Sequence, residues 1–292
     1  MSIAFEKASQ SFLVSLRSGG KSHNTIRNYA SDLETLGSFL REHKLDYKSL
    51  ALVDLDNYHR SLKIKGLKPN SRRRKIVTAK TFLRFMSAHI DLSTVGSEKV
   101  IPPEKVEKPP KLVAPSFVEA VIADQPLTPI GCRNRALIRV LWETGALVTE
   151  VLALKKTDFT KTHNGAVIIF RGKRTRQCNI GPKATAALDE LKAQLQSHQN
   201  YLFYGYTRGG PNPEKLSPRG VEMLFKAWSK KFKVKHFKPR IMRHLFVMRQ
   251  LLHGRSETEV MGFLGLRTGY VFRIYRPLLA QQSVELQELA QA

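Results

Sequence analysis

The first hundred residues repeat apolar and polar positions at the spacing of helices. Residues 23–43, HNTIRNYASDLETLGSFLREH, carry one apolar face, with Asn24 as the expected N-cap. That face consists of Ile26, Tyr29, Leu33, Leu36, Phe39 and Leu40. Residues 70–90, NSRRRKIVTAKTFLRFMSAHI, have the same period and predict a second amphipathic helix.

The second of these helices has a basic polar side. Its cations are Arg72, Arg73, Arg74, Lys75 and Lys80. A basic face of this kind is typical either of an ordinary solvated surface or of one that contacts nucleic acid. The pattern alone leaves both interpretations open.

A proline-rich stretch interrupts the periodic pattern at residues 100–115, VIPPEKVEKPPKLVAP. It carries five prolines between charged residues and has no helical or strand period. We therefore expect an extended linker at residues 101–111. It would join a helical domain of residues 1–100 to a second domain of residues 112–292.

The second half predicts helices and a small sheet. An apolar helix at 133–143 leads into TGALVTEVLAL, residues 144–154, which is typical of a glycine turn followed by another helix. Residues 165–182, GAVIIFRGKRTRQCNIGP, predict a hairpin with Lys173 near its tip. A helix at 183–197 and a largely helical remainder follow. The expected fold class is mainly α with a small β-sheet.

Charge indicates the class of partner. The 292 residues contain 49 Lys and Arg against 24 Asp and Glu, a net charge of +25 that is spread along the chain. Such a surface favours nucleic acid, because cations neutralise phosphates and release their counterions. A membrane is the weaker alternative, since no apolar run approaches the roughly 20 residues of a span. Cys132 and Cys178 have no metal-ligand spacing and are too few for a disulfide framework, which favours a reducing, cytoplasmic setting.

Several side chains of the second half suit phosphate chemistry. Lys173 lies in the hairpin, Arg240 and Arg243 lie one turn apart in KPRIMRHLFVMRQLLHG, and Tyr275 lies in a later arginine-rich segment. Transfer of a phosphodiester to a tyrosine hydroxyl needs a nucleophile, fixed cations and an acid for the leaving oxygen, but no metal or cofactor. Taken singly, each arginine is more typical of a surface phosphate contact or a solvated charge, and the tyrosine is more typical of a packed side chain than of a nucleophile.

The motifs taken in order resemble those of a tyrosine recombinase of the phage integrase and Xer type, over nearly all of the chain. TIRNYASDLETLGSFL and SRRRKIVTAKTFLRFM resemble that family's N-terminal helical core-binding (SAM-like) domain. Four later segments resemble the family's catalytic domain in their order and spacing. They are CRNRALIRVLWETGALVTEVLALKKTDF, SPRGVEMLFKAW, KPRIMRHLFVMRQLLHG and FLGLRTGYVFRIYRPL. The resemblance implies a two-domain tyrosine recombinase fold that acts without metal or cofactor.

The resemblance also implies roles for single residues. Tyr275 matches the family's nucleophile, Arg243 an arginine that clamps the phosphate, and Lys173 the hairpin lysine that acts as general acid. Arg240 stands where the family has a histidine, so positive charge is kept but a group that exchanges protons at neutral pH is lost.

Two further positions depart from the family pattern. Leu147 replaces an arginine of the TG-x-R-x-x-E turn, although Thr144, Gly145 and Glu150 are kept, and Leu266 replaces a histidine or tryptophan. Loss of one hydrogen-bond donor to the reacting phosphate costs about 10²–10³ in rate, and loss of the arginine about 10³–10⁵. We therefore expect severely slowed cleavage.

Two alternatives concern the position of Leu147. Other cations could move into the space of the missing arginine, and the candidates are Arg171, Arg176, Arg240 and Arg267. A leucine on an apolar helix also suits a packing role, which would indicate a settled loss of the arginine.

DNA contacts and assembly are expected at separate surfaces. The expected DNA-contacting residues are Arg72, Arg73, Arg74, Lys80, Lys173, Arg174, Arg176, Arg219, Arg240 and Arg243. The C-terminal segment LLAQQSVELQELAQA predicts a helix that either docks on a neighbouring protomer on DNA or folds back on its own domain.

The sequence supports three functional hypotheses. The first is a protein that binds a specific duplex DNA site with a degenerate catalytic centre, as a regulatory or architectural protein or as the silent partner of an active recombinase. The second is an active site-specific recombinase that forms a 3′-phosphotyrosine at Tyr275. The third is a non-specific nucleic-acid binder.

Overall fold

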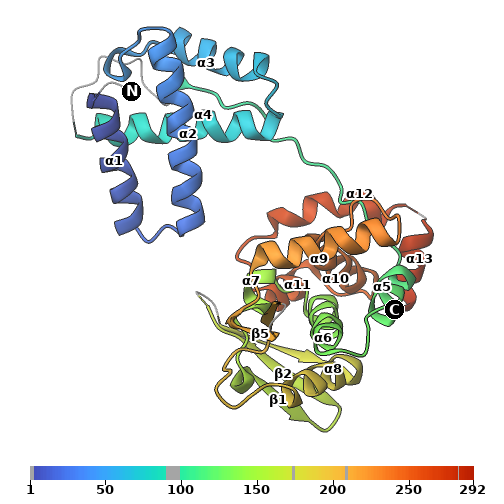
Figure 1. Ribbon diagram of the computed structural model, residues 1–292. Coiled ribbons are helices and arrows are strands. Elements are labelled where there is room, and N and C mark those ends of the chain that lie inside the picture. Colours follow the sequence, from blue (N-terminus) through green and yellow to red (C-terminus); the bar gives the residue numbers. More distant parts are fainter. Residues whose placement is uncertain (1–2, 90–98, 173–174, 208–209, 282) are drawn as a thin grey trace. The chain divides into compact units, whose positions relative to one another are not determined.

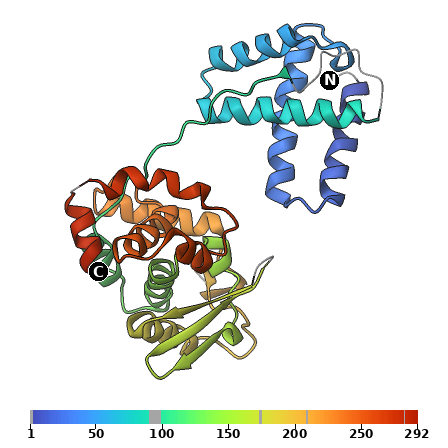
Figure 2. The ribbon, with the colours of Figure 1, turned by 180° about the vertical axis from the view of Figure 1, so that it is seen from behind.

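The chain forms two compact units, residues Met1–Glu107 and Lys108–Ala292. The computed structural model describes residues 3–89, 99–172, 175–207, 210–281 and 283–292 (Figures 1 and 2). Most described residues lie in helices, and the strands form two small antiparallel sheets. The expected fold class, mainly α with a small sheet, is therefore confirmed.

The first unit is a helical bundle with an aromatic core. Its helices are α1 (Ile3–Ser18), α2 (His23–Glu42), α3 (Leu52–Ile64) and α4 (Pro69–Ser87), with a short 3₁₀ turn η1 (Tyr47–Ser49). Phe82 of α4 makes edge contacts with Phe5 and Phe12 of α1, at centroid distances of 5.5 and 5.7 Å. These rings bury a large apolar area at the centre of the unit.

The start of α2 corrects one expectation from the sequence. Ser22, and not Asn24, is the N-cap, and its hydroxyl accepts a hydrogen bond from the Thr25 amide at 3.2 Å. Both residue types are good N-caps, so residue preference alone does not distinguish Ser22 from Asn24. With Ser22 as its N-cap, the helix begins at His23.

The basic side of α4 is not a uniformly solvated face. Lys75 is buried, and its ammonium group lies 2.9 Å from Asp32 of α2, whose carboxylate also accepts from Thr78 at 3.0 Å. A buried lysine needs such a partner. Lys75 thus holds α2 and α4 together.

Part of the predicted linker packs against the first unit. Val100 is buried in its core, and Asn70 at the start of α4 exchanges two hydrogen bonds with the backbone of Val106. The segment from Val100 to Val106 is therefore attached to α4, although its prolines and charges predicted an extended connection.

The second unit contains helices and both sheets. Its helices are α5 (Pro115–Ala123), α6 (Pro129–Thr144), α7 (Val148–Val151), α8 (Pro182–Ala193), α9 (Pro218–Lys231), α10 (Pro239–Leu252), α11 (Glu257–Leu264), α12 (Arg276–Leu279) and α13 (Val284–Gln291), with 3₁₀ turns η3 (Lys156–Asp158) and η4 (Gly269–Ile274). Its strands are β1 (Phe159–Thr162), β2 (Gly165–Phe170), β3 (Arg176–Ile180), β4 (Tyr204–Thr207) and β5 (Gly210–Lys215).

The predicted hairpin is β2 and β3, with Phe170 opposite Arg176, and β1 adds a third strand. The second sheet, β4 and β5, was not expected, because its segments YGYT and GPNPEK have few of the β-branched residues that mark strands. Figures 1 and 2 show α6 and α8 side by side next to the larger sheet.

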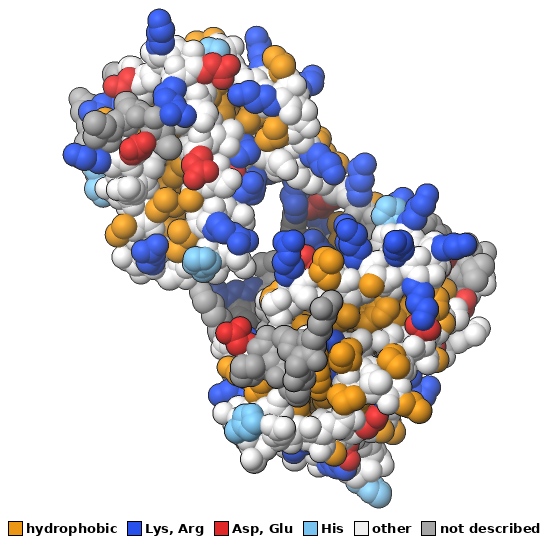
Figure 3. All heavy atoms as spheres, viewed as in Figure 1, with side chains coloured by type: hydrophobic (Ala, Val, Ile, Leu, Met, Phe, Trp, Pro, Cys, Tyr) orange, Lys and Arg blue, Asp and Glu red, His pale blue; other side chains and the backbone are white. Residues whose placement is uncertain are grey.

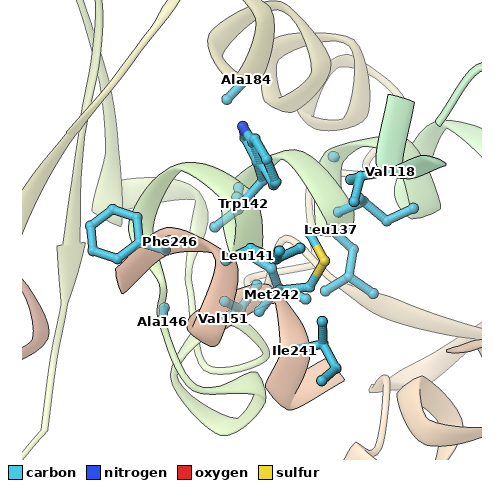
Figure 4. Packing of buried hydrophobic residues seen from close by; sticks show 14 of the residues in the cluster. Val118, Leu137, Leu141, Trp142, Ala146, Val151, Ala184, Ile241, Met242 and Phe246 are labelled. Carbon is cyan, nitrogen blue, oxygen red and sulfur yellow. The ribbon is translucent and has the colours of Figure 1, made fainter. Parts of the chain in front are cut away.

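The core of the second unit lies between α6, α7 and α10. Leu137 and Leu141 of α6 pack against Met242 of α10 and Val151 of α7, and all four are fully buried (Figure 4). Removing such side chains from water is the main stabilising contribution to the fold. The contact fixes α10 against the turn that follows α6.

The C-terminal helix α13 packs on its own unit. Leu289 and Leu286 are buried, and the Glu288 carboxylate accepts from the Ser116 amide of α5 at 3.1 Å. This is the second of the two arrangements expected for the segment. Docking of this helix on a neighbouring protomer stays a prediction.

Candidate functional site

A tight turn after α6 forms one wall of the candidate site. Gly145 ends α6 in the left-handed conformation, with φ of 57°. A Cβ atom there would lie 2.5 Å from the Phe246 ring of α10. Glycine is therefore required by both conformation and space.

The other kept residues of TGALVTE also shape this turn. The Thr144 hydroxyl donates to the Val140 carbonyl at 2.6 Å and accepts from the Ala146 amide at 3.2 Å. The Glu150 carboxylate accepts from the Leu147 amide at 2.6 Å, which caps the start of α7. Thr144, Gly145 and Glu150 thus have structural roles that do not depend on an arginine at position 147.

Leu147 does not have the packing role that its apolar neighbours predicted. It is the N-cap residue of α7, a helix of a single turn, and 50% of its surface is exposed. Val148, the next residue, packs against the core instead. The packing alternative for Leu147 does not fit this structure, because Leu147 precedes the first turn of α7 and half of its surface is exposed.

Arg243 is anchored to this turn. It lies on α10, half-buried, and its Nη1 donates to the Gly145 carbonyl at 2.8 Å. Burial lowers the pKa of the Arg243 guanidinium. A guanidinium stays charged in proteins, so Arg243 places a positive charge beside the turn.

Tyr275 lies buried between η4 and α12, with 4% of its surface exposed. Its hydroxyl is 2.7 Å from Nδ1 of His244, the residue after Arg243 on α10. Burial raises the pKa of Tyr275 to about 12, although Arg243 and Arg240 oppose this increase. The hydroxyl is therefore protonated at neutral pH.

His244 was not among the residues that the sequence pattern identified. Its imidazole is buried, and burial, with Arg240 and Arg243, lowers the pKa of His244 to about 4. The sequence did contain a signal for His244, because it is a polar residue inside the apolar stripe of Ile241, Leu245 and Met248. Such a residue must find a partner in the interior.

Arg176 is not a surface cation. It is buried, and its Nη1 and Nη2 donate to the Glu150 carboxylate at 2.7 and 3.2 Å. Its Nε donates to the Phe263 carbonyl of α11 at 2.8 Å, and its guanidinium lies over the Phe170 ring. The interpretation of Arg176 as a DNA contact therefore does not fit this structure.

The other candidate positions of the second unit differ in exposure. Arg240 at the start of α10 and Arg219 at the start of α9 are exposed. Leu266 is half-buried and packs against the core. Lys173 and Arg174 lie outside the described residues.

Two candidate cations of the first unit bond to the segment that follows α4. The Arg73 Nη1 atom donates to the Pro103 carbonyl at 2.5 Å, and Lys80 Nζ donates to the Val100 carbonyl at 3.1 Å. Arg74 is exposed and pairs with Asp32 at 2.9 Å, while Arg72 is half-buried. Several of the charges expected at DNA are therefore engaged within the unit.

The part of the chain that the structure describes holds neither a metal-ligand cluster nor a membrane-spanning helix. No three His, Cys, Asp or Glu side chains in it come together as metal ligands. No described helix has the length and apolarity needed to cross a membrane.

Comparison with known families assigns both units. Residues 113–282 match the model of the phage integrase family, and residues 10–89 match its N-terminal SAM-like domain. The chain belongs to the phage integrase family. Within this integrase family it is Xer-like, because curated Xer tyrosine recombinases match most of its length.

Two of those relatives show the degree of similarity. Tyrosine recombinase XerC of Staphylococcus saprophyticus subsp. saprophyticus is 26% identical over 267 residues, which cover 89% of this chain and 88% of the relative. Tyrosine recombinase XerD of Rhizobium meliloti is 26% identical over 284 residues, which cover 91% and 89%.

Solved structures agree in fold. The XerH recombinase in a post-cleavage complex with a palindromic difH substrate has a TM-score of 0.71 at 17% identity, covering 91% of this chain and 79% of that one. A lambda integrase dimer on a COC′ core site has a TM-score of 0.71 at 15% identity, covering 95% and 78%. These neighbours confirm the two-domain tyrosine recombinase fold of this chain.

The structure thus brings part of the predicted constellation together. Arg243 contacts the turn that carries Leu147, and Tyr275 contacts α10 one residue further on, at His244. Where the family pattern has an arginine, this chain has the exposed Leu147. The candidate nucleophile and one candidate phosphate-binding cation are therefore both attached to α10 beside this turn, and the turn lacks the arginine that the resemblance implies.

Proposed function

We propose that this protein binds a specific duplex DNA site through the recombinase fold and cleaves DNA slowly or not at all. It would act in DNA recombination as a regulatory or architectural protein, or as the silent partner of an active recombinase. The observation that carries the proposal is the exposed Leu147, two residues after Gly145, whose carbonyl accepts a hydrogen bond from Arg243. A leucine there cannot neutralise charge on a phosphate, a role worth about 10³–10⁵ in rate.

Two of the four cations that could replace the arginine are already engaged. Arg176 is buried in its pair with Glu150, and Arg171 pairs with the buried Asp158 at 2.6 Å. Removing Arg176 from Glu150 would leave a partly buried carboxylate without its cation. Both contacts support a site in which Arg176 and Arg171 are held elsewhere and do not replace the missing arginine.

The active-recombinase alternative has its own support. Tyr275 and Arg243 keep positions that are compatible with the family roles, and Arg240 and Arg267 are exposed. Either exposed arginine could turn toward a bound phosphate without breaking a buried pair. Covalent capture of DNA distinguishes this alternative from the main proposal.

DNA binding is supported by charge and by fold. The net charge is +25, and Figure 3 shows Lys and Arg side chains over the visible surface of both units. The XerH and lambda integrase structures of the same fold are DNA complexes. Arg219 and Arg74 are exposed candidates for phosphate contacts, and Lys173 and Arg174 remain candidates from the sequence.

Selection from random duplexes tests the binding proposal. One enriched sequence is expected, whereas uniform binding across sequences would support a non-specific binder and contradict us. On the selected site, Arg219→Gln should reduce the slope of log affinity against log salt by about 1. Arg135→Gln is the matched control, because Arg135 is already paired with Glu190 at 2.7 Å and its loss should leave the slope unchanged.

A further inference from the structure

His244 makes a specific contact with the candidate nucleophile. Its Nδ1 atom lies 2.7 Å from the Tyr275 hydroxyl, and the two ring centroids are 5.6 Å apart. Both side chains are buried, and they belong to different elements, α10 and the junction of η4 with α12. The hydrogen bond therefore fixes the direction of a hydroxyl that would otherwise rotate freely.

The protonation states determine which group donates. The pKa of His244 is lowered to about 4, so its imidazole is neutral at pH 7. The pKa of Tyr275 is raised to about 12, so its hydroxyl carries a proton. The phenol consequently donates to Nδ1, and the imidazole proton resides on Nε2.

We propose that His244 is a positioning residue that orients the Tyr275 hydroxyl for attack on a phosphodiester; this inference rests on the slow cleavage that the proposed function allows. In that reaction the phenolic oxygen forms a bond to phosphorus, and the bond from phosphorus to the 5′ oxygen breaks. One proton leaves the phenol while the 5′ oxygen gains one, so the reaction is balanced.

Orientation, and not proton storage, is the role that the surroundings favour. A proton on His244 would lie close to two arginines of the same helix, Arg240 and Arg243, and Arg243 is in turn near Arg176 and Glu150. The arginine charges disfavour an imidazolium. A neutral acceptor that keeps the hydroxyl in one rotamer can still matter, because a misplacement of about 1 Å can cost about 10²-fold in rate.

The first measurement tests the contact itself without any cleavage. Spectra of ¹⁵N-histidine-labelled full-length protein should show His244 as a neutral imidazole with the proton on Nε2. In Tyr275→Phe the Nδ1 resonance should move to the position of an unbonded nitrogen. An unchanged Nδ1 resonance in Tyr275→Phe would overturn the inference.

The second measurement separates positioning from packing. In a Leu147→Arg background, the rate of covalent capture on a nicked duplex should fall about 10²-fold in His244→Phe, with unchanged DNA affinity. His244→Asn should keep most of the rate, because its carboxamide oxygen can accept from the phenol near the position of Nδ1. His253→Gln is the control, since His253 bonds to the Ala290 carbonyl of α13 and not to the tyrosine.

Each outcome bears on one claim. Equal loss of rate in His244→Asn and His244→Phe would overturn positioning, and so would the absence of any covalent product from Leu147→Arg itself. If neither wild type nor any variant binds DNA, that result would instead contradict the proposed function. The histidine spectra would then decide on the contact between His244 and Tyr275.

Discussion

Two carboxylates, one in each unit, hold buried cations in different ways. Asp32 in the first unit is 1% exposed and binds Lys75, Thr78 and Arg74 in a network that only connects helices. Glu150 in the second unit is partly exposed and binds Arg176 and the Leu147 amide beside the candidate site. The first network stabilises a bundle, whereas the second shapes a turn that faces the site.

The comparison shows that net charge overstates the cations available to DNA. Lys75 and Arg176 are counted in the +25, but each is buried against a carboxylate. At the candidate site, Arg243 is the cation anchored beside the turn, and the exposed neighbour on that turn is a leucine. Function therefore depends on where individual charges lie.

The largest expected effect comes from breaking the interior network. Asp32→Ala should lower the free energy of unfolding by about 3–5 kcal/mol, because it leaves the buried charge of Lys75 without a carboxylate and with only the Thr35 hydroxyl as acceptor. Glu34→Ala, an exposed change on the same helix, is the control. Chemical denaturation measures both, and equal small effects would show that the Asp32 network is not structural.

The next effect concerns pH and the neutral histidine of the site. Because the pKa of His244 is about 4 in the folded protein and near 6.5 in the unfolded chain, the unfolded state binds the proton more readily. The neutral His244 therefore contributes fully to the free energy of unfolding above pH 6.5. About 3 kcal/mol of that free energy is lost as the pH falls toward 4. Denaturation at several pH values should show a steeper loss in wild type than in His244→Asn. Parallel curves would contradict a buried neutral imidazole.

Breaking the second network should cost less than breaking the first. Glu150→Ala should destabilise by about 2 kcal/mol, less than a fully buried pair because the carboxylate is partly hydrated. Glu150→Gln should lie between Glu150→Ala and wild type, since it keeps an acceptor for the Leu147 amide. A loss as large as that of Asp32→Ala would remove the contrast between the two carboxylates.

The smallest expected effect is at Leu147 itself. Leu147→Ala should change the free energy of unfolding by no more than about 0.5 kcal/mol, because the side chain is half exposed. Leu141→Ala, a fully buried change in the preceding helix, should cost about 2–5 kcal/mol. A large effect at Leu147 would restore the packing interpretation that the structure rejects.

Local signals in the sequence predicted much of the fold. The hairpin expected at residues 165–182 is present as β2 and β3, and the helix expected from residue 183 begins at Pro182. Gly145 was expected in a turn, and its contact with Phe246 explains why no other residue suits that position. These features depend on neighbours in sequence, which is why pattern alone sufficed.

Features that depend on distant contacts were not predictable. The burial of Arg176 requires Glu150 and Phe263, which lie far from it in sequence. The contact of His244 with Tyr275 joins residues 31 positions apart. Periodicity assigns a residue to a face of its own helix, but it does not identify what packs against that face.

Covalent capture of DNA tests the central claim most directly. Wild type, Leu147→Arg and Tyr275→Phe are incubated with the selected duplex carrying a nick, so that the cleaved fragment diffuses away and any phosphotyrosine product persists. We expect little or no adduct with wild type, a rate at least about 10³-fold higher with Leu147→Arg, and none with Tyr275→Phe. Rapid adduct formation by wild type, abolished in Tyr275→Phe, would contradict the account and establish an active recombinase.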